Sequence, residues 1–279
     1  MYRIVEKREL ASRVKLIKVS APEIARKAKP GQFVILRVNH VGERFPLTLA
    51  DWNAEGGTIT LVFLEVGVST RKLGELNVGD SILDVVGPLG NPTEVKYYGS
   101  VCVVGGGVGV AAAYPVAKAL KEVGNKVTSI IGARTDALLI FEDEMEKCSD
   151  ALYISTDDGT KGYKGFVSDL LRDLLLKGYK FDIVYAVGPA LMMKAVAEVT
   201  RPFRIKTIVS LNPIMVDGIG MCGACRVLVG GKTRFACVDG PEFDAHEVDF
   251  AELIRRQRAF LAEERIALET FEKSISGGE

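Results

Sequence analysis

The sequence predicts a multidomain chain: an antiparallel β-barrel, a doubly wound α/β domain and a small cysteine-rich module with a terminal helix. Three observations support this. The first third consists of short strand-like runs separated by Gly and Pro. The middle alternates strand and helix patterns, and three of the five cysteines lie in one C-terminal segment. A length of 279 residues suffices for two domains and a small module. We expect the boundaries 1–96, 97–210 and 211–279.

Residues 1–96 are expected to form the barrel. Apolar runs of strand length are separated by turn sequences such as Lys29-Pro30-Gly31 and Glu55-Gly56-Gly57. Many short strands punctuated by Gly and Pro are typical of a small antiparallel barrel. The expected strands are Val14–Val19, Phe33–Val38, Thr58–Leu64 and Ser81–Val86.

The pattern changes near Tyr98. An apolar run at Val101–Val104 leads into the glycine loop 105–109 and then an Ala-rich helical segment that extends through Leu120. Strands that alternate with helices imply a parallel, doubly wound sheet. The later expected strands are Val127–Ile131, Leu152–Ser155, Ile183–Val187 and Lys206–Ser210. The later expected helices are Phe141–Lys147, Gly165–Leu176 and Leu191–Thr200.

The C-terminal part begins with the cysteine segment after Leu211. Two short runs, 227–229 and 233–237, flank a Gly-Gly pair and predict a hairpin. From Ala245 to about Lys273 the sequence predicts one helix. That helix has no obvious place inside the small module, so we expect it to pack on the other domains or on another subunit.

Composition excludes several classes of protein. The net charge is zero, and no basic run marks a nucleic-acid-binding face. The apolar runs are far too short to span a bilayer, and the N-terminus lacks the apolar region of a signal peptide. An odd number of cysteines, three of them clustered, fits a metal site in a reducing compartment better than a disulfide scaffold. We therefore expect a cytoplasmic protein.

The glycine loop indicates a dinucleotide site. Glycines after a buried strand let backbone N–H groups approach a pyrophosphate closely, although a glycine-rich turn without a ligand remains an alternative. Two later turns, Gly188-Pro189 and Asp157-Asp158, are expected on the same edge of the sheet. Acidic groups favour a ribose 2′-OH over a 2′-phosphate, which favours NAD over NADP. Arg134 argues the other way, and a solvated turn is the alternative for the two aspartates.

Two segments of the barrel follow predicted strands, Arg44–Thr48 and Gly67–Thr70. The second is a small turn with hydroxyl groups, where N–H and O–H donors could hold a phosphate. By composition alone, each is an ordinary loop.

The cysteine segment carries the most specific signal. Cys222 and Cys225 form a C-x2-C pair, and Cys237 adds a third thiol, which suits zinc or an iron–sulfur cluster. Crowded glycines favour a cluster. Plant-type [2Fe–2S] loops use C-x4-C-x2-C with a distant Cys, and Asp217 stands where the first Cys would be. A carboxylate can ligate iron as a harder donor, while an Asx turn is the alternative role for Asp217.

Taken together, the segments RFPLT, GVST, GGGVGVAAAYPVAKAL, YAVGPALMM and D-x4-C-x2-C…C resemble the ferredoxin–NADP reductase superfamily over nearly the whole chain. Two flavin and iron–sulfur electron-transfer families are most similar. One is the electron-transfer subunit of type B dihydroorotate dehydrogenase, for which four cluster cysteines are expected. The other is the small subunit of NADH-dependent reduced ferredoxin:NADP oxidoreductase. Asp217 in place of a Cys favours the second family.

The resemblance implies roles for individual residues. The FAD-binding residues would be Arg44, Pro46, Leu47, Thr48, Gly67, Ser69 and Thr70. The superfamily places an Arg two residues before Leu47, where this chain has Phe45, so the role of Arg44 departs from the pattern. The NAD(H)-binding residues would be Gly106, Gly107, Gly109, Asp157, Asp158, Gly188 and Pro189, without the Cys that usually precedes Gly188. The cluster ligands would be Asp217, Cys222, Cys225 and Cys237.

The implied function is electron transfer with no catalytic side chain. NADH would reduce FAD, and single electrons would pass through a [2Fe–2S] cluster to a larger flavin and iron–sulfur partner in a heterodimer. That partner could in turn serve ferredoxin. Electron bifurcation follows from the family resemblance alone. Two alternatives stay open: the dihydroorotate dehydrogenase subunit, and a zinc-stabilised nucleotide-binding module without redox activity.

Overall fold

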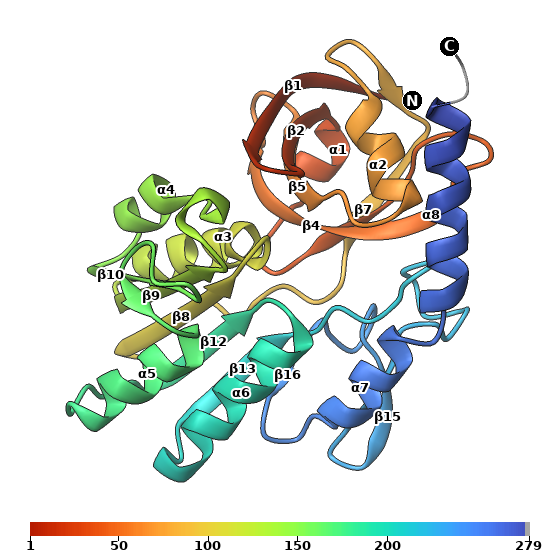
Figure 1. Ribbon diagram of the computed structural model, residues 1–279. Coiled ribbons are helices and arrows are strands. Elements are labelled where there is room, and N and C mark those ends of the chain that lie inside the picture. Colours follow the sequence, from red (N-terminus) through yellow and green to blue (C-terminus); the bar gives the residue numbers. More distant parts are fainter. Residues whose placement is uncertain (277–279) are drawn as a thin grey trace.

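A computed structural model describes residues 1–276 of the chain. It contains two seven-stranded sheets and one two-stranded sheet. Figure 1 shows the N-terminal sheet curled into a nearly closed barrel, with the second sheet and its helices beside it. The C-terminal segment runs along both parts. The predicted fold class is therefore confirmed.

The barrel is an antiparallel sheet with the strand order β6-β1-β2-β5-β4-β3-β7. Its strands are β1 (Tyr2–Ala11), β2 (Val14–Ser20), β3 (Phe33–Arg37), β4 (Arg44–Asn53), β5 (Thr58–Leu64), β6 (Ser81–Ile82) and β7 (Asp84–Leu89). Two short helices complete it, α1 (Pro22–Ala25) and α2 (Val68–Glu75). Three of the predicted strands are present nearly as expected. The fourth, expected at Ser81–Val86, is divided between β6 and β7.

The interpretation of Arg44–Thr48 as a loop was wrong, because these residues begin β4. They pair only with β3, and pairing with β5 starts at Leu49. One edge of β4 is therefore unpaired here, so Pro46 can lie in the strand without the loss of a ladder hydrogen bond on that side. The segment Gly67–Thr70 likewise is more than a turn, since it forms the N-cap and first turn of α2.

Strand β3 separates two apolar cores. Val34 and Leu36 lie in the barrel core. Phe33 and Ile35 point the other way, into a core that also contains residues of the second sheet and of the cysteine module. This alternation follows from the two-residue period of a strand. Strand β3 therefore contributes side chains to both cores.

The second sheet has the order β11-β10-β9-β8-β12-β13-β16. The strands and helices of this domain are β8 (Ser100–Gly106), α3 (Gly109–Glu122), β9 (Lys126–Ala133), α4 (Glu142–Lys147), β10 (Ala151–Thr156), β11 (Tyr163–Lys164), α5 (Val167–Leu176), β12 (Ile183–Val187), α6 (Ala190–Thr200) and β13 (Lys206–Ser210). Two 3₁₀ turns lie at Asp136–Leu138 and Arg201–Phe203. Strands β8, β9, β10, β12 and β13 are parallel, as predicted. Strand β9 pairs with one edge of β8, and β12 pairs with the other edge. The direction in which strands are added therefore reverses at β8, and a topological switch point lies between β8 and β12.

The C-terminal module forms the predicted hairpin, β14 (Arg226–Val229) and β15 (Lys232–Phe235). It also adds a strand that was not predicted: β16 (Glu242–Asp244) pairs antiparallel with β13 at the edge of the second sheet. The prediction of one terminal helix was wrong. The segment is divided into α7 (Phe250–Gln257) and α8 (Leu261–Ser276).

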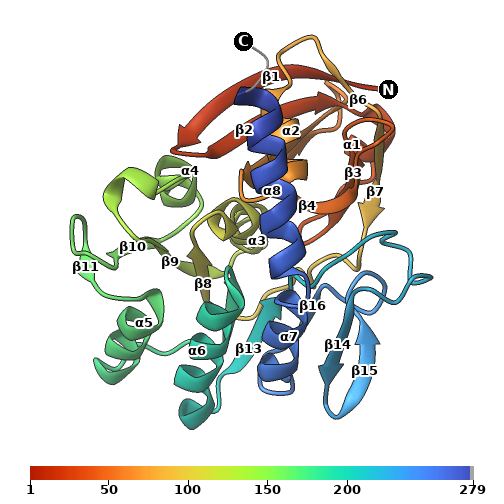
Figure 2. The ribbon, with the colours of Figure 1, turned by 45° about the vertical axis from the view of Figure 1, so that its right-hand side comes forward.

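The two terminal helices pack on different parts of the molecule. Helix α7 contacts α6 and β14, whereas α8 lies along α2 of the barrel (Figure 2). Arg71 of α2 forms a 2.7 Å ion pair with Glu272, and the Lys72 ammonium lies 5.6 Å from the centre of the Phe271 ring. The expectation that this segment packs on the other domains is thus confirmed for α8. Within the described residues, no helix is both long and apolar enough to cross a membrane.

Candidate functional site

The glycine loop lies at the carboxyl end of β8, next to the turn that follows β12. A Cβ at Gly109 would lie 2.6 Å from the carbonyl oxygen of Val187, and one at Gly106 would lie 2.3 Å from Sδ of Met192. Gly109 is therefore needed for packing between the two turns, whereas a side chain at Gly106 would displace the Met192 side chain of α6. Gly107 differs, because its φ is +56° and a Cβ would meet nothing within 4 Å. The space next to Gly107 is therefore open.

Gly188 and Pro189 lie on the same edge, as predicted. Pro189 is the N-cap residue of α6. A Cβ at Gly188 would lie 2.8 Å from Met192, so this side chain covers both Gly106 and Gly188. Met192 was not predicted as a site residue, and only its position four residues after Gly188 could have indicated it.

The two aspartates after β10 differ in their environment. The carboxylate of Asp158 accepts hydrogen bonds from the backbone N–H of Thr160 at 3.0 Å and from its hydroxyl at 2.7 Å. These bonds lower the pKa of Asp158. Desolvation, followed by the charge of Asp158, raises the pKa of Asp157, which Arg134 partly opposes. Asp158 therefore stabilises its own turn.

On the barrel, β4 presents Pro46 and Thr48 on one face and Leu47 on the other. Leu47 packs against the barrel core, opposite Val34 on the neighbouring strand. Pro46 lies opposite Ile35, and side chains directly opposite one another point to the same face. Pro46 and Thr48 therefore lie on the outer surface of the barrel. Arg44 is exposed at the start of the strand.

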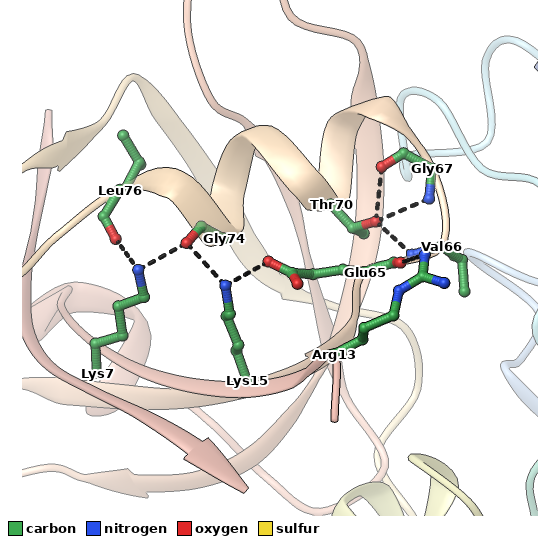
Figure 3. Close-up of polar contacts among 9 residues, drawn as sticks. All are labelled: Lys7, Arg13, Lys15, Glu65, Val66, Gly67, Thr70, Gly74 and Leu76. Atoms are coloured by element: carbon green, nitrogen blue, oxygen red, sulfur yellow. Dashed lines mark hydrogen bonds and ion pairs between the residues drawn. The ribbon is translucent and has the colours of Figure 1, made fainter. Parts of the chain in front are cut away.

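The N-terminus of α2 is built around Thr70. Its hydroxyl oxygen accepts hydrogen bonds from the N–H groups of Val66 at 3.1 Å and Gly67 at 3.2 Å, and its O–H donates to the carbonyl of Gly67 (Figure 3). Ser69 Oγ lies 3.2 Å from Glu43 Oε2. Gly67 has an ordinary φ of −136°, and a Cβ there would meet nothing within 4 Å. The fold itself does not require glycine at this position, so the open space is suited to the close approach of a phosphate.

The C-terminal end of α2 is held by two lysines that were not predicted as part of the site. Lys7 Nζ donates to the carbonyls of Gly74 at 2.6 Å and Leu76 at 2.7 Å, and Lys15 Nζ pairs with Glu65 at 2.6 Å (Figure 3). Cations suit the carbonyl end of a helix. A Cβ at Gly74 would lie only 1.7 Å from Glu65 Oε1. A glycine inside a helix was the sequence feature that could have indicated this close contact.

The cysteine loop places its four predicted ligands in two pairs. Cys225 Sγ and Cys237 Sγ are 3.2 Å apart, and both residues are buried. Two thiolates on one tetrahedral metal lie roughly 3.8 Å apart when each metal–sulfur bond is about 2.3 Å. Cys222 is exposed. Its backbone N–H donates to Asp217 Oδ2 at 2.7 Å, and Ile219 N–H donates to Oδ1 at 3.0 Å.

Two pairs suit a two-iron cluster better than a single zinc ion. Within residues 1–276, no three His, Cys, Asp or Glu side chains converge on one metal position. The other two cysteines lie elsewhere: burial raises the pKa of the thiols of Cys102 and Cys148, and both act as apolar residues. The Ile219 hydrogen bond gives Asp217 the geometry of an Asx turn and lowers its pKa. A carboxylate has further lone pairs, so this turn is compatible with ligation.

A half-buried carboxylate, Glu242, joins the three parts of the chain, and no local sequence pattern indicates this role. Thr93 Oγ1 donates to Glu242 Oε1 at 2.5 Å, and the hydroxyl of Tyr185 donates to the same oxygen. Thr93 follows the barrel, Tyr185 lies in β12 and Glu242 lies in β16. Asn91 adds a 2.7 Å bond from its N–H to the carbonyl of Gly240. The cysteine module is therefore fixed to both domains.

Two family models match the chain. The iron–sulfur cluster binding domain of dihydroorotate dehydrogenase B matches residues 212–249, which contain Asp217 and the three clustered cysteines. The oxidoreductase NAD-binding domain matches residues 103–198, which contain the glycine loop and the turns after β10 and β12.

Curated relatives match nearly the whole chain. A dihydroorotate dehydrogenase B (NAD(+)) electron transfer subunit homolog from Thermotoga maritima is 50% identical, over 99% of this chain and 97% of the relative. The chain belongs to this family of electron-transfer subunits. Another member, the dihydroorotate dehydrogenase B electron transfer subunit of Bacillus caldolyticus, is 35% identical over 88% of this chain and 96% of the relative.

Solved structures agree with this family. A chain in the structure of an NADH-dependent reduced ferredoxin-NADP oxidoreductase, determined for insights into flavin-based electron bifurcation, is 50% identical. The match covers 98% of both chains, with a TM-score of 0.93. An Amycolatopsis cytochrome P450 reductase shares the fold at 22% identity and a TM-score of 0.63, over 73% of this chain and 66% of the reductase. The predicted place in the ferredoxin–NADP reductase superfamily is confirmed.

As a member of this electron-transfer subunit family, the chain is an oxidoreductase subunit that uses FAD, an iron–sulfur cluster and NADH. The residues present fit these groups. The open space at Gly67 fits a phosphate of FAD, the open space at Gly107 fits a dinucleotide, and the thiol pair Cys225–Cys237 fits one iron of a cluster.

Proposed function

We propose that this chain is the NADH-oxidising small subunit of a reduced ferredoxin:NADP oxidoreductase. In this role it passes electrons from NADH through FAD and a [2Fe–2S] cluster to a larger partner. When bound, FAD accepts a hydride and the cluster accepts one electron at a time. The side chains bind and position the cofactors, and none acts as a general acid or base.

The observation that carries this proposal is the ligand pattern D-x4-C-x2-C…C. Asp217 replaces a thiol that we expect in the dihydroorotate dehydrogenase subunits. The 50% identity to a chain of the ferredoxin-NADP oxidoreductase structure, over 98% of both chains, supports the same choice. Electron bifurcation, and a link to ferredoxin through the partner, are further parts of the proposal. They rest on that similarity.

We assign the parts of the chain accordingly. Residues 1–96 bind FAD, residues 97–210 bind NAD(H), and residues 211–279 hold the cluster. The FAD contacts are Arg44, Pro46, Leu47, Thr48, Gly67, Ser69 and Thr70. The NAD(H) contacts are Gly106, Gly107, Gly109, Asp157, Asp158, Gly188 and Pro189. The cluster ligands are Asp217, Cys222, Cys225 and Cys237. We place the protein in the cytoplasm as part of a heterodimer.

The dihydroorotate dehydrogenase B electron-transfer subunit is the second candidate. The names of the Thermotoga maritima and Bacillus caldolyticus relatives and the matching iron–sulfur domain favour it. The two candidates share the cofactors and differ in the partner.

Affinity purification of the tagged chain from its native host, under anaerobic conditions, separates the candidates. The proposal predicts a larger flavin and iron–sulfur protein in stoichiometric amount, and NADH-dependent reduction of NADP in the presence of reduced ferredoxin. A partner that oxidises dihydroorotate would overturn the choice of complex.

A further inference from the structure

The proposed flavin segment and the cysteine loop lie on the same face of the barrel wall. Ile35 lies directly opposite Pro46, and Phe33 lies directly opposite Thr48. Directly opposed residues of an antiparallel pair point to the same side. Phe33 and Ile35 also share a core with Cys225 and Cys237. The outer surface of β3 is therefore in contact with the cluster module, and β4, one strand away, carries the flavin segment.

The contact between loop and barrel depends on one glycine. Gly218 is buried and follows the proposed ligand Asp217. A Cβ at Gly218 would lie 2.7 Å from Cγ1 of Ile35 and 2.8 Å from Cδ1 of Leu89. Both distances are too short for a real side chain, so the backbone of the loop rests directly on β3 and β7.

A second glycine of the loop, Gly220, serves as a matched control for Gly218. Gly220 also has a positive φ, +85° against +75° for Gly218, so alanine strains the backbone at both positions. A Cβ at Gly220 would instead lie 3.2 Å from the exposed side chain of Val238, which belongs to the module itself. Alanine at 220 therefore reproduces the backbone strain without pushing the loop away from the barrel.

We propose that Gly218 is a positioning residue for electron transfer: the absence of its side chain seats the cluster loop against Ile35 and Leu89, next to the flavin segment. This inference rests on the proposed function. When bound, FAD would accept the two electrons of a hydride from NADH, the cluster would take them one at a time, and the larger partner would reoxidise the cluster. Electron tunnelling slows steeply with separation, so a displaced loop slows this transfer.

The experiment is anaerobic stopped-flow mixing of NADH with the loaded wild-type chain and with Gly218→Ala and Gly220→Ala. Flavin bleaching and cluster bleaching are followed separately, and iron content and EPR are measured on the same samples. We expect normal FAD content and unchanged flavin reduction in both variants. Cluster reduction should slow about tenfold in Gly218→Ala and stay near the wild-type rate in Gly220→Ala. Adding Ile35→Ala to Gly218→Ala should restore most of the rate.

Equal rates in Gly218→Ala and wild type, with a full cluster in both, would overturn the inference, as would equal slowing in the two alanine variants. Leu89→Phe tests the contact from the barrel side and leaves the loop sequence intact, so it serves if Gly218→Ala fails to assemble its cluster. It should also slow cluster reduction, and an unchanged rate would count against the contact. If NADH did not reduce the flavin of the wild-type protein, that result would instead overturn the proposed function.

Discussion

Asp217 and Cys222 are joined by a 2.7 Å hydrogen bond from the backbone N–H of Cys222 to the carboxylate. The bond closes the first half of the cysteine loop and brings the one oxygen candidate next to the exposed thiol. The same carboxylate forms an Asx turn with Ile219. Substitutions can therefore separate its role in the turn from its role as a ligand.

We expect Asp217→Asn to lose most of its iron and keep FAD. The amide oxygen can still accept from Ile219 N–H, but a neutral amide is a much weaker iron ligand than a carboxylate. Asp217→Ala should behave in the same way. Asp217→Cys should keep a cluster with a changed EPR spectrum, because a thiolate replaces the oxygen donor. Iron analysis and EPR provide the measurement. A full cluster with an unchanged spectrum in the Asn variant would show that Asp217 serves only the turn.

Gly67 tests the proposed phosphate site. A Cβ there meets no atom of the chain within 4 Å, and its φ suits any residue. Gly67→Ala should therefore unfold at the wild-type temperature without FAD, yet bind FAD about tenfold or more weakly, a loss of about 1.4 kcal/mol. Thermal unfolding and FAD titration of the apoprotein check this. Unchanged affinity would remove Gly67 from the site.

For Gly74 we expect the opposite result, a loss of stability and not a direct loss of FAD binding. A Cβ there would collide with Glu65, which pairs with Lys15. Gly74→Ala should destabilise the apoprotein by roughly 1–3 kcal/mol, as overpacking usually does, and should weaken FAD binding only as a consequence. Chemical denaturation of both apoprotein variants gives the comparison. A more stable Gly74→Ala would mean that Glu65 moves aside freely.

Most of the fold was predictable because many of its strands are short, apolar runs bounded by glycine and proline. Strand β4 was missed because Pro46 reads as a loop residue, and only the pairing of β4 with β3 shows that one edge is free. Helix α2 was missed because it is short and polar, with Gly67 at its N-cap and Gly74 inside it. Strand β16 has three residues and exists only because β13 offers an edge.

The site residues were predictable where glycine and cysteine spacing carries the chemistry. Gly107 and the cysteine loop are in this group. The spacing could not distinguish Gly107 from Gly106 and Gly109, whose neighbours come from β12 and α6. Contacts between distant segments, such as Gly218 with Ile35, leave no pattern in the local sequence.

Asp157 should give NADH binding a pH dependence. Its pKa is raised by desolvation and by Asp158, and only the ionised carboxylate accepts strongly from a ribose hydroxyl. The KM for NADH should therefore rise as the pH falls through the pKa of Asp157, at a higher pH than for an ordinary Asp. Steady-state reduction of an artificial acceptor, measured across pH, tests this.

The same assay includes a matched control. Asp157→Asn should raise the KM for NADH, weaken the preference for NADH over NADPH and abolish the pH effect. Asp158→Asn should change little, since an amide oxygen can still accept from Thr160. A wild-type preference for NADPH would contradict the assignment.

Electrons from NADH are expected to reach the cluster through the flavin of this one chain. The most direct measurement is anaerobic addition of NADH to the reconstituted chain, followed by freezing and EPR. We predict flavin bleaching together with the signal of a reduced [2Fe–2S] cluster. A bleached flavin beside a cluster that dithionite reduces and NADH does not would contradict the claim.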